Sequence, residues 1–304
     1  MSVKVAYRGR FAPSPTGPLH FGSLLAAVAS WCDARRNAGT WLLRIEDVDV
    51  PRNRNGASDE IVRTLASYGF EWDGAVVRQS TRGALYQAAL ADLTRRGLAF
   101  RCACTRKELE RAPTGAGGER IYPGTCRNGV AAGRDGRAWR LRVDDRRIAF
   151  VDRLQGPQQQ WLDRDVGDFV IKRADGQFAY QLAVVVDDAD QAITHVVRGA
   201  DLLASTPRQI WLQQQLGLST PSYLHHPIAI DARGEKLSKQ THASPLPAHP
   251  LPALTLAWRF LDQPEPPAPL ATVAEFWRWA HHAWNPRALP PLAKLPLPAS
   301  TRAL

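Results

Sequence analysis

The sequence contains few of the features that mark several large protein classes. Only four of its 304 residues are cysteines, which is too few for a disulfide scaffold. It has no stretch of about 18 apolar residues, as a membrane-spanning helix requires, and no signal-peptide pattern at the amino terminus. A G-x-x-x-x-G-K-[ST] phosphate-binding loop is also absent. We therefore expect a cytoplasmic protein with reduced thiols and no membrane association.

The charge balance is strongly basic. Lysine and arginine together number 39 against 29 acidic residues, which gives a net charge of +10. A basic excess favours polyanionic partners such as nucleic acid or nucleotide phosphates. A GC-rich genome also enriches arginine, so charge alone does not choose between the two explanations. A length of 304 residues is enough for one large domain or two moderate ones with a real core.

The stretch "GRFAPSPTGPLHFGS", residues 9–23, packs three prolines and three glycines around one histidine. It cannot be a helix or a central strand, because proline removes a backbone hydrogen-bond donor and glycine allows backbone conformations that other residues avoid. A helix is predicted directly afterwards and ends near Gly39. Its apolar positions recur at helical spacing: Leu24, Leu25, Val28, Trp31 and Cys32. A Gly/Pro loop that enters a helix forms an anion site, since backbone amides and the helix dipole converge there. A proline-rich turn with a core histidine is the alternative.

Alternating elements predict an α/β fold with a parallel sheet, at least to residue 100. "TWLLRIED" (40–47) is typical of a buried strand. A helix is expected over 58–70 with Ser58 as its N-cap. Another is expected over 81–97, with its apolar face carried by Leu85, Ala89 and Leu93.

The pattern changes in the middle and again at the end. "DFVIKRADGQFAYQLAVVVDDA" (168–189) suggests two strands joined at the turn Asp175-Gly176. A later helix over 205–218 has Thr206 as the expected cap and Pro207 at its first position. Residues 241–304 hold 13 of the 23 prolines and four of the ten tryptophans. Two short helices, near 254–261 and 273–284, are expected in this tail. Its tryptophans suggest that the tail packs against another surface.

A second stretch, "GEKLSKQ" (234–240), places Lys236 and Lys239 three positions apart behind a glycine. Two ammonium groups at that spacing suit a triphosphate whose charge grows as pyrophosphate leaves. A solvated basic loop is the commoner explanation of an isolated K-x-x-K.

Together the two stretches resemble the signatures of class I aminoacyl-tRNA synthetases: "PLHFGS" is similar to their HIGH motif and "KLSKQ" to their KMSKS loop. "RFAPSPTGPLHFG", "RIEDVD" and "VVRGADLLASTPRQI" narrow the resemblance to the glutamyl-tRNA synthetase catalytic core, over roughly residues 8–242. The resemblance implies a Rossmann-type parallel-sheet catalytic domain that is split by an inserted α+β, zinc-containing, acceptor-binding-like region. A short Pro-rich helical segment follows. The expected division is 1–100 and 191–242 for the catalytic domain, 101–190 for the insertion and 243–304 for the Pro/Trp-rich tail.

The resemblance also implies the roles of individual residues. Glutamate carries two carboxylates and one ammonium group, so its site should offer cationic forks and one anion. The expected glutamate-binding residues are Arg10, Phe11, Ala12, Pro13, Ser14, Glu46, Tyr180 and Arg198. The expected ATP-binding residues are His20, Gly22, Ser23, Lys236, Ser238 and Lys239. Catalysis is expected from His20, Lys236 and Lys239, which would stabilise the ATP phosphates, with Mg²⁺ bound to ATP. Without the resemblance, Glu46 is better explained as a strand-end partner of Arg44.

The tail is short compared with a full glutamyl-tRNA synthetase, which continues with a large helical anticodon-binding region. Only residues 241–304 follow the KMSKS-like loop here. This resembles truncated members of the family, which transfer glutamate to queuosine in the anticodon of tRNA(Asp). ATP, L-glutamate and queuosine-containing tRNA(Asp) are then the expected partners of a monomer. The alternatives are a shortened synthetase that charges a tRNA 3′ end or a small acceptor, and an inert synthetase-derived RNA-binding module.

Three cysteines form a further cluster, Cys102-x-Cys104 and then Cys126 after a Gly-rich loop. Closely spaced cytoplasmic thiols are metal ligands more often than disulfides, although three fall one short of the usual four. Unconnected thiols are the alternative. The family resemblance implies one structural zinc ion per chain, with Tyr122 as the fourth ligand. Cys32 is better explained as an inert thiol in the core.

Basic residues surround this cluster, and as a group they fit a sequence-independent contact with RNA phosphates, although solvation explains any single one. They are Arg101, Arg106, Lys107, Arg111, Arg120, Arg127, Arg134, Arg137, Arg140 and Arg142.

Overall fold

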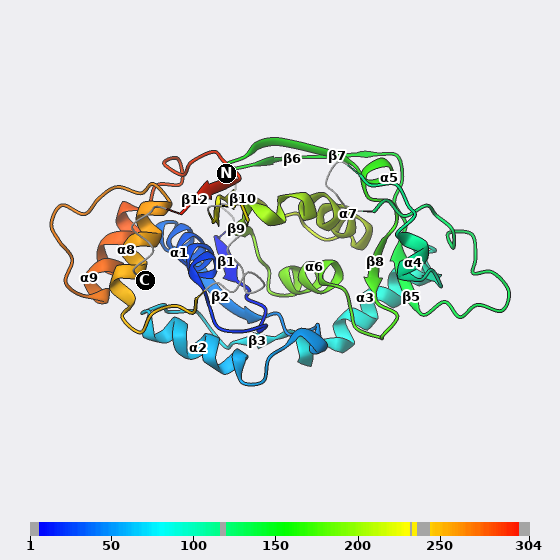
Figure 1. Cartoon of the computed structure of the whole chain (residues 1–304), viewed down its shortest axis with the longest axis horizontal. Helices are drawn as coiled ribbons and strands as arrows, with labels where there is room; N and C mark the ends of the chain where they lie inside the picture. The colour runs from blue at the N-terminus through cyan, green and yellow to red at the C-terminus, as the bar shows by residue number, and fades with distance from the viewer. Residues whose placement is uncertain (1–5, 116–119, 232, 236–243, 298–304) are drawn as a thin grey trace.

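The computed structural model describes residues 6–115, 120–231, 233–235 and 244–297. Its centre is a parallel arrangement of strands (Figure 1). Strands β1 (Arg8–Phe11), β2 (Thr40–Ile45) and β3 (Val77–Arg78) pair in that order, and β9 (His195–Gly199) pairs with β10 (Ser222–His226). The Thr194 amide, one residue before β9, donates to the Arg8 carbonyl at 2.9 Å, so β9 runs beside β1. The predicted α/β class with a parallel sheet is confirmed.

The helix that follows the opening loop, α1 (Phe21–Arg36), lies in the middle of the molecule. It is buried on nearly every side, as its apolar composition requires. Even Asp33 is fully buried, and its carboxylate accepts from Arg153 at 2.6 and 3.0 Å and from the Tyr7 hydroxyl at 2.6 Å. Cys32 is 0% exposed with a free thiol, as expected of a core cysteine.

The tail lies against α1 on one side of the molecule (Figure 1). Its helices are α8 (Pro250–Phe260) and α9 (Val273–Ala283). Trp258 and Trp284 are buried, and the Trp277 ring lies 4.4 Å from that of Trp31 in α1. Strand β12 (Lys294–Pro296) then pairs in parallel with β11 (Ile228–Ile230). The tail therefore contributes directly to the core around α1.

Strands between Ala99 and Lys172 form two antiparallel units, of which the first lies on the side of the molecule away from the tail (Figure 1). The first is the sheet β4 (Ala99–Cys102), β5 (Ala138–Leu141), β8 (Phe169–Lys172), in that order. The second is the hairpin β6 (Arg147–Asp152) and β7 (Gly156–Trp161). The remaining helices are α2 (Ala57–Ser67), α3 (Gly83–Arg95), α4 (Arg106–Leu109), α5 (Leu162–Asp165), α6 (Tyr180–Asp190) and α7 (Thr206–Leu216), with short 3₁₀ turns at Val50–Arg52, Gln79–Thr81 and Ala200–Ser205. No helix among these described ranges is long and apolar enough to cross a membrane.

The predicted second strand after the Asp175-Gly176 turn is wrong, because Tyr180–Asp190 forms the helix α6. The run "YQLAVVVDDAD" is buried on most sides, and a short buried helix cannot be told from a buried strand by periodicity. Tertiary burial therefore overrides the strand preference of its three valines.

Three local predictions are also wrong. Helix α2 is capped by Gly56 at φ 75° rather than by Ser58, which lies inside the first turn. The buried face of α3 is Tyr86, Leu90 and Leu93, while Leu85 is 40% exposed. Thr206 is the first residue of α7 rather than its cap, and its hydroxyl oxygen accepts from Arg198 at 2.8 Å. A two-residue shift of the helix start decides the outcome for α2, a one-residue shift decides it for α7, and tertiary packing decides it for α3.

Candidate functional site

A cavity of about 530 Å³ opens where β1, the loop after it and β9 meet the start of α1. All the residues predicted to bind glutamate line this cavity: Arg10, Phe11, Ala12, Pro13, Ser14, Glu46, Tyr180 and Arg198. His20, Gly22 and Ser23 line it as well. Lys236, Ser238 and Lys239 lie outside the described residues. Thr16, Asp201 and His226 also line the cavity and were not predicted.

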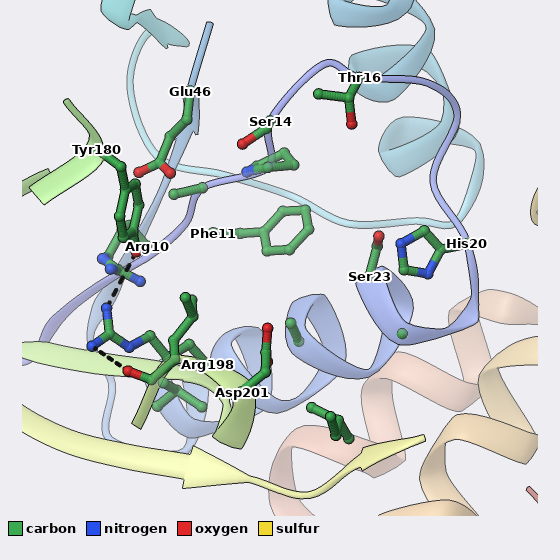
Figure 2. Close-up of a pocket in the computed structure, with 18 of the residues that line it drawn as sticks. Arg10, Phe11, Ser14, Thr16, His20, Ser23, Glu46, Tyr180, Arg198 and Asp201 are labelled. Atoms are coloured by element: carbon green, nitrogen blue, oxygen red, sulfur yellow. Dashed lines mark hydrogen bonds between the residues drawn. The ribbon is translucent and has the colours of Figure 1, made fainter. Parts of the chain in front are cut away.

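The cavity has two chemically different ends (Figure 2). Figure 2 shows Arg10, Arg198, Tyr180 and Glu46 gathered on one side and His20 and Ser23 on the other. Arg10 and Arg198 lie near the carboxyl ends of the parallel strands β1 and β9, and Glu46 directly follows β2. Tyr180 is the first residue of α6. The second group comes from the start of α1.

The opening loop is fixed to the sheet by its backbone. The Glu46 amide donates to the Pro13 carbonyl at 2.9 Å, and the Arg54 amide donates to the Pro15 carbonyl at 2.9 Å. Gly17 has a φ of 150°, a conformation that favours glycine. His20 precedes the first residue of α1, so its side chain lies where the helix dipole favours an anion.

A buried charge network lies behind the cationic end. Arg10 donates to both carboxylate oxygens of Asp188, at 3.1 and 3.3 Å. Arg44 donates to Asp188 at 2.7 Å and to Glu46 at 3.3 Å. The Arg44–Glu46 pair proposed as the simpler explanation of Glu46 therefore exists, and the same carboxylate also lines the cavity. Burial is the main cause that raises the pKa of Glu46, against the lowering effect of Arg44 and Arg10.

Arg198 is held differently. Its Nε donates to Nε2 of His225 at 2.9 Å, and its terminal nitrogens donate to Thr206, Tyr180 and the Leu202 carbonyl at 2.8, 3.4 and 3.4 Å. All four acceptors are uncharged groups when His225 is neutral. Sequence reasoning missed His225 and Asp188, because both act through partners that are distant along the chain.

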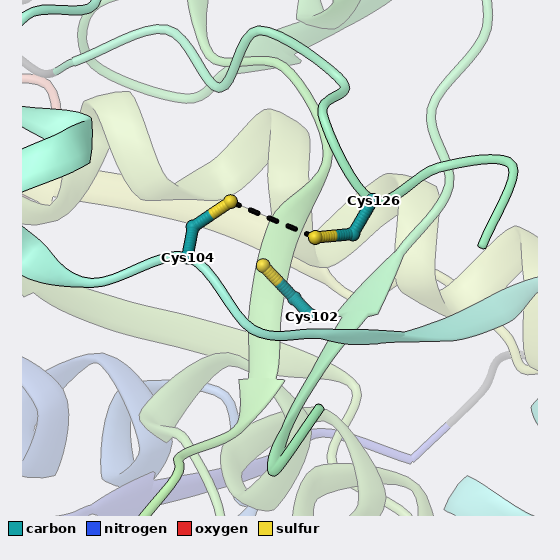
Figure 3. Close-up of side chains that lie close together, drawn as sticks. All are labelled: Cys102, Cys104 and Cys126. Atoms are coloured by element: carbon teal, nitrogen blue, oxygen red, sulfur yellow. Dashed lines mark hydrogen bonds between the residues drawn. The ribbon is translucent and has the colours of Figure 1, made fainter. Parts of the chain in front are cut away.

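The three clustered thiols form a second site (Figure 3). The Sγ atoms of Cys102, Cys104 and Cys126 all lie within 4.8 Å of one another, and none forms a disulfide. The Cys104–Cys126 distance is 3.7 Å. Four-coordinate zinc with Zn–S bonds of about 2.3 Å requires sulfurs about 3.8 Å apart. The Tyr122 hydroxyl lies 3.5 Å from the sulfur of Cys102 and 3.8 Å from that of Cys104, so this donor set fits a zinc ion.

Arg140 belongs to this cluster rather than to an RNA-facing surface, which corrects its predicted role. It is 7% exposed, its Nε donates to the Cys102 sulfur at 3.3 Å, and its guanidinium lies 3.8 Å from the centre of the Tyr122 ring. Arg127 pairs with Asp168 and Arg134 with Glu108. Other members of the predicted basic group are exposed: Arg101, Arg106, Lys107, Arg111, Arg120 and Arg137.

Comparison with known proteins agrees with this fold. Residues 6–246 match the family described as tRNA synthetases class I (E and Q), catalytic domain. A crystal structure of a glutamate tRNA ligase from Elizabethkingia meningosepticum, in complex with its amino acid, has the same fold. The TM-score is 0.80 at 24% identity, and the match covers 97% of this chain and 67% of that one.

Two relatives named Glutamyl-Q tRNA(Asp) synthetase are much more similar in sequence. The one from Dechloromonas aromatica is 58% identical over 297 residues, which cover 96% of this chain and 99% of that protein. The one from Aromatoleum aromaticum is 56% identical over 281 residues, with coverage of 92% and 89%. The chain therefore belongs to the class I tRNA synthetases of the glutamate and glutamine type, within the group of relatives that carry this name. It is an enzyme of the synthetase type.

Proposed function

We propose that the chain activates L-glutamate with ATP and transfers it to queuosine in the anticodon of tRNA(Asp). The observation that supports the activation step is the two-ended cavity. Arg10, Arg198 and Glu46 lie at one end, and the start of α1 lies at the other. The names of the relatives at 56–58% identity support the transfer step.

Within this proposal, Arg10 and Arg198 bind the two carboxylates of glutamate and Glu46 binds its ammonium group. Ala12 and Ser14 line the pocket through backbone and hydroxyl, with Phe11 and Pro13 beside them, and Tyr180 closes it. Buried hydrogen-bonding groups discriminate strongly, since an amino acid that lacks the matching charge leaves them unpaired.

ATP lies along the other end of the cavity, with His20, Gly22 and Ser23 at its phosphates. Lys236, Ser238 and Lys239 complete the phosphate site, and Mg²⁺ accompanies the nucleotide. The substrate's own carboxylate attacks the α-phosphorus, so pyrophosphate leaves and the mixed anhydride forms. The protein contributes orientation and charge stabilisation rather than a nucleophile.

Cys102, Cys104, Tyr122 and Cys126 hold one structural zinc ion in this proposal. Bound there, zinc would cross-link the end of β4 to the loop that contains Tyr122 and Cys126. We also keep the division into a catalytic domain (1–100 and 191–242), an insertion (101–190) and a tail (243–304) as part of the proposal. The cytoplasmic location and the monomeric state remain predictions.

Exchange of labelled pyrophosphate into ATP tests the activation step. The assay is run with glutamate, glutamine or aspartate, each with and without tRNA. We expect exchange with glutamate alone among the three. No exchange under any condition would favour the inert RNA-binding module and contradict the proposal.

A further inference from the structure

Arg198 lines the cavity and is held from behind by two buried side chains, His225 and Asp152, that do not line it. Its Nε donates to Nε2 of His225 at 2.9 Å, and Nδ1 of His225 lies 2.6 Å from Asp152. Arg198 and His225 are direct neighbours in register on β9 and β10, so their side chains share one face of the sheet. His225 and Asp152 are 0% and 1% exposed.

The chemistry of arginine fixes the protonation of His225. A guanidinium has only donors and stays charged, so Nε2 of His225 must accept. Nδ1 then carries the proton and donates to Asp152, and the imidazole is neutral. Burial, with help from the charge of Arg198, lowers the pKa of His225 to about 4 against the opposing effect of Asp152.

Asp152 is itself firmly anchored at the end of β6. Its Oδ1 accepts from the amides of Leu154, Gln155 and His225, at 3.0, 2.8 and 3.2 Å. The imidazole orientation is therefore set from behind by a carboxylate that has little freedom to move.

The contrast with Arg10 shows what this arrangement does. Arg10 forms a contact ion pair with Asp188, so part of its attraction for a second carboxylate is already cancelled. In the described part of the chain, Arg198 has no carboxylate within 4.0 Å. In the series Arg198–His225–Asp152, the carboxylate of Asp152 is separated from the guanidinium by the width of the His225 ring.

We propose that His225, anchored by Asp152, is the positioning residue that orients Arg198 toward a substrate carboxylate while leaving the guanidinium charge uncancelled. This inference rests on the proposed function, because it assigns Arg198 to glutamate. An uncharged acceptor fixes the orientation of the Arg198 guanidinium and leaves its charge available to a substrate carboxylate. A carboxylate at position 225 would instead form an ion pair with this guanidinium. The Thr206 hydroxyl, 3.2 Å from the same Nε2, completes the uncharged shell.

Three variants separate position from charge. H225Q keeps an uncharged acceptor for Arg198 and a donor for Asp152. H225L removes both. The double variant H225E/D152N keeps the hydrogen-bonded connections and the net charge, but moves the negative charge from position 152 into contact with Arg198. His195→Leu is the matched control, because His195 starts β9, the strand that carries Arg198, and does not line the cavity.

The readout is ATP–pyrophosphate exchange, titrated separately with glutamate and with ATP, together with the kcat/KM ratio of glutamate over glutamine. H225L and H225E/D152N are expected to raise the glutamate KM by about tenfold or more and to lower the selectivity ratio, with the ATP KM nearly unchanged. H225Q and H195L should stay within about twofold of the parent, since neither loses an Arg198 bond. Circular dichroism confirms that each variant is folded. If H225L is unfolded, the double variant and H225Q carry the test.

Arg198→Ala distinguishes the two levels of the proposal. If it leaves the glutamate KM unchanged, the assignment of Arg198 under the proposed function is wrong. If it raises the KM while folded H225L and H225E/D152N do not, only the positioning role of His225 is overturned. A parent-like glutamate KM in H225E/D152N alone would overturn the part played by charge.

Discussion

Asp188 accepts two hydrogen bonds from Arg10, although the two residues are 178 positions apart along the chain. The contact joins β1, which contributes lining residues to the cavity, to α6, which follows the antiparallel sheet along the chain. Both side chains are buried, so the pair ties the cationic end of the cavity to the second half of the chain.

Replacing Asp188 by asparagine leaves two buried guanidiniums, Arg10 and Arg44, without their shared carboxylate. We expect the free energy of unfolding to fall by about 3 kcal/mol, as for other broken buried pairs. Urea denaturation measures it. Asp190→Asn is the control, because the Asp190 side chain, at the end of the same helix, is 48% exposed in its ion pair with Arg82. A control loss as large as that of D188N would contradict this assignment.

The same pair predicts a dependence of stability on pH. Burial opposes ionisation of Asp188, but Arg10 and Arg44 outweigh it and lower its pKa. A carboxyl with a lowered pKa in the folded state stabilises the protein fully above the unfolded value of about 3.9. That stabilisation is lost as the pH falls toward the folded value. D188N should therefore lose less stability than the parent between about pH 5 and 3, in denaturation curves recorded across that range.

Asp33 and Arg153 form a second long-range contact, between α1 and the turn of the β6–β7 hairpin. The Asp33 carboxylate also accepts from Tyr7 and Trp284. We expect D33A to lower the free energy of unfolding by about 3–5 kcal/mol, because it leaves Arg153 and two further donors unpaired. Glu265→Gln is the control, since its pair with Arg259 is about 60% exposed on both sides and such pairs contribute about 0–1 kcal/mol. Equal losses would argue against the role of burial.

The thiol cluster predicts the behaviour of a metal. Tyr122→Phe removes one oxygen at the cluster while retaining the ring that Arg140 covers. We expect the purified parent to contain about one zinc per chain and Y122F to release zinc to a chelator at least about tenfold faster, since a tetrahedral site loses a ligand. Cys32→Ala should leave the zinc content unchanged, because that thiol lies in α1. Parent protein without zinc, or Y122F that retains it as firmly, contradicts the four-ligand site.

Glu46 is expected to bind the substrate ammonium group. E46Q should reduce kcat/KM for glutamate by about 100-fold in pyrophosphate exchange, as for loss of a buried charged contact. Glu71→Gln, at an exposed carboxylate, is the control and should stay near the parent. An unchanged E46Q would leave Glu46 as the structural partner of Arg44 alone.

The sequence predicted the parts of the fold that local chemistry determines. Prolines and glycines fix the loop before α1, and helical spacing from Leu24 to Cys32 defines the helix itself. The same reasoning failed for α6, because a buried valine-rich run has no periodicity that separates helix from strand.

The resemblance predicted eleven of the residues that line the cavity, and the others required the tertiary structure. Asp188 and His225 act on Arg10 and Arg198 across strand and helix contacts that no local pattern encodes. The adjacent acids Asp187 and Asp188 inside an apolar run were the one available signal, since buried acids need partners. The prediction for Arg140 erred in the opposite direction. Its charge suggested an exposed contact with RNA, but the side chain is buried against Cys102 and Tyr122.

The acceptor is the central claim, and one transfer experiment tests it most directly. Radiolabelled glutamate and ATP are supplied with two pools of tRNA(Asp), one with queuosine and one without. The account predicts label only in the queuosine pool, and loss of that label when periodate oxidises the queuosine diol while the 3′ end is protected. Equal labelling of both pools would mean 3′-end charging and would contradict the account.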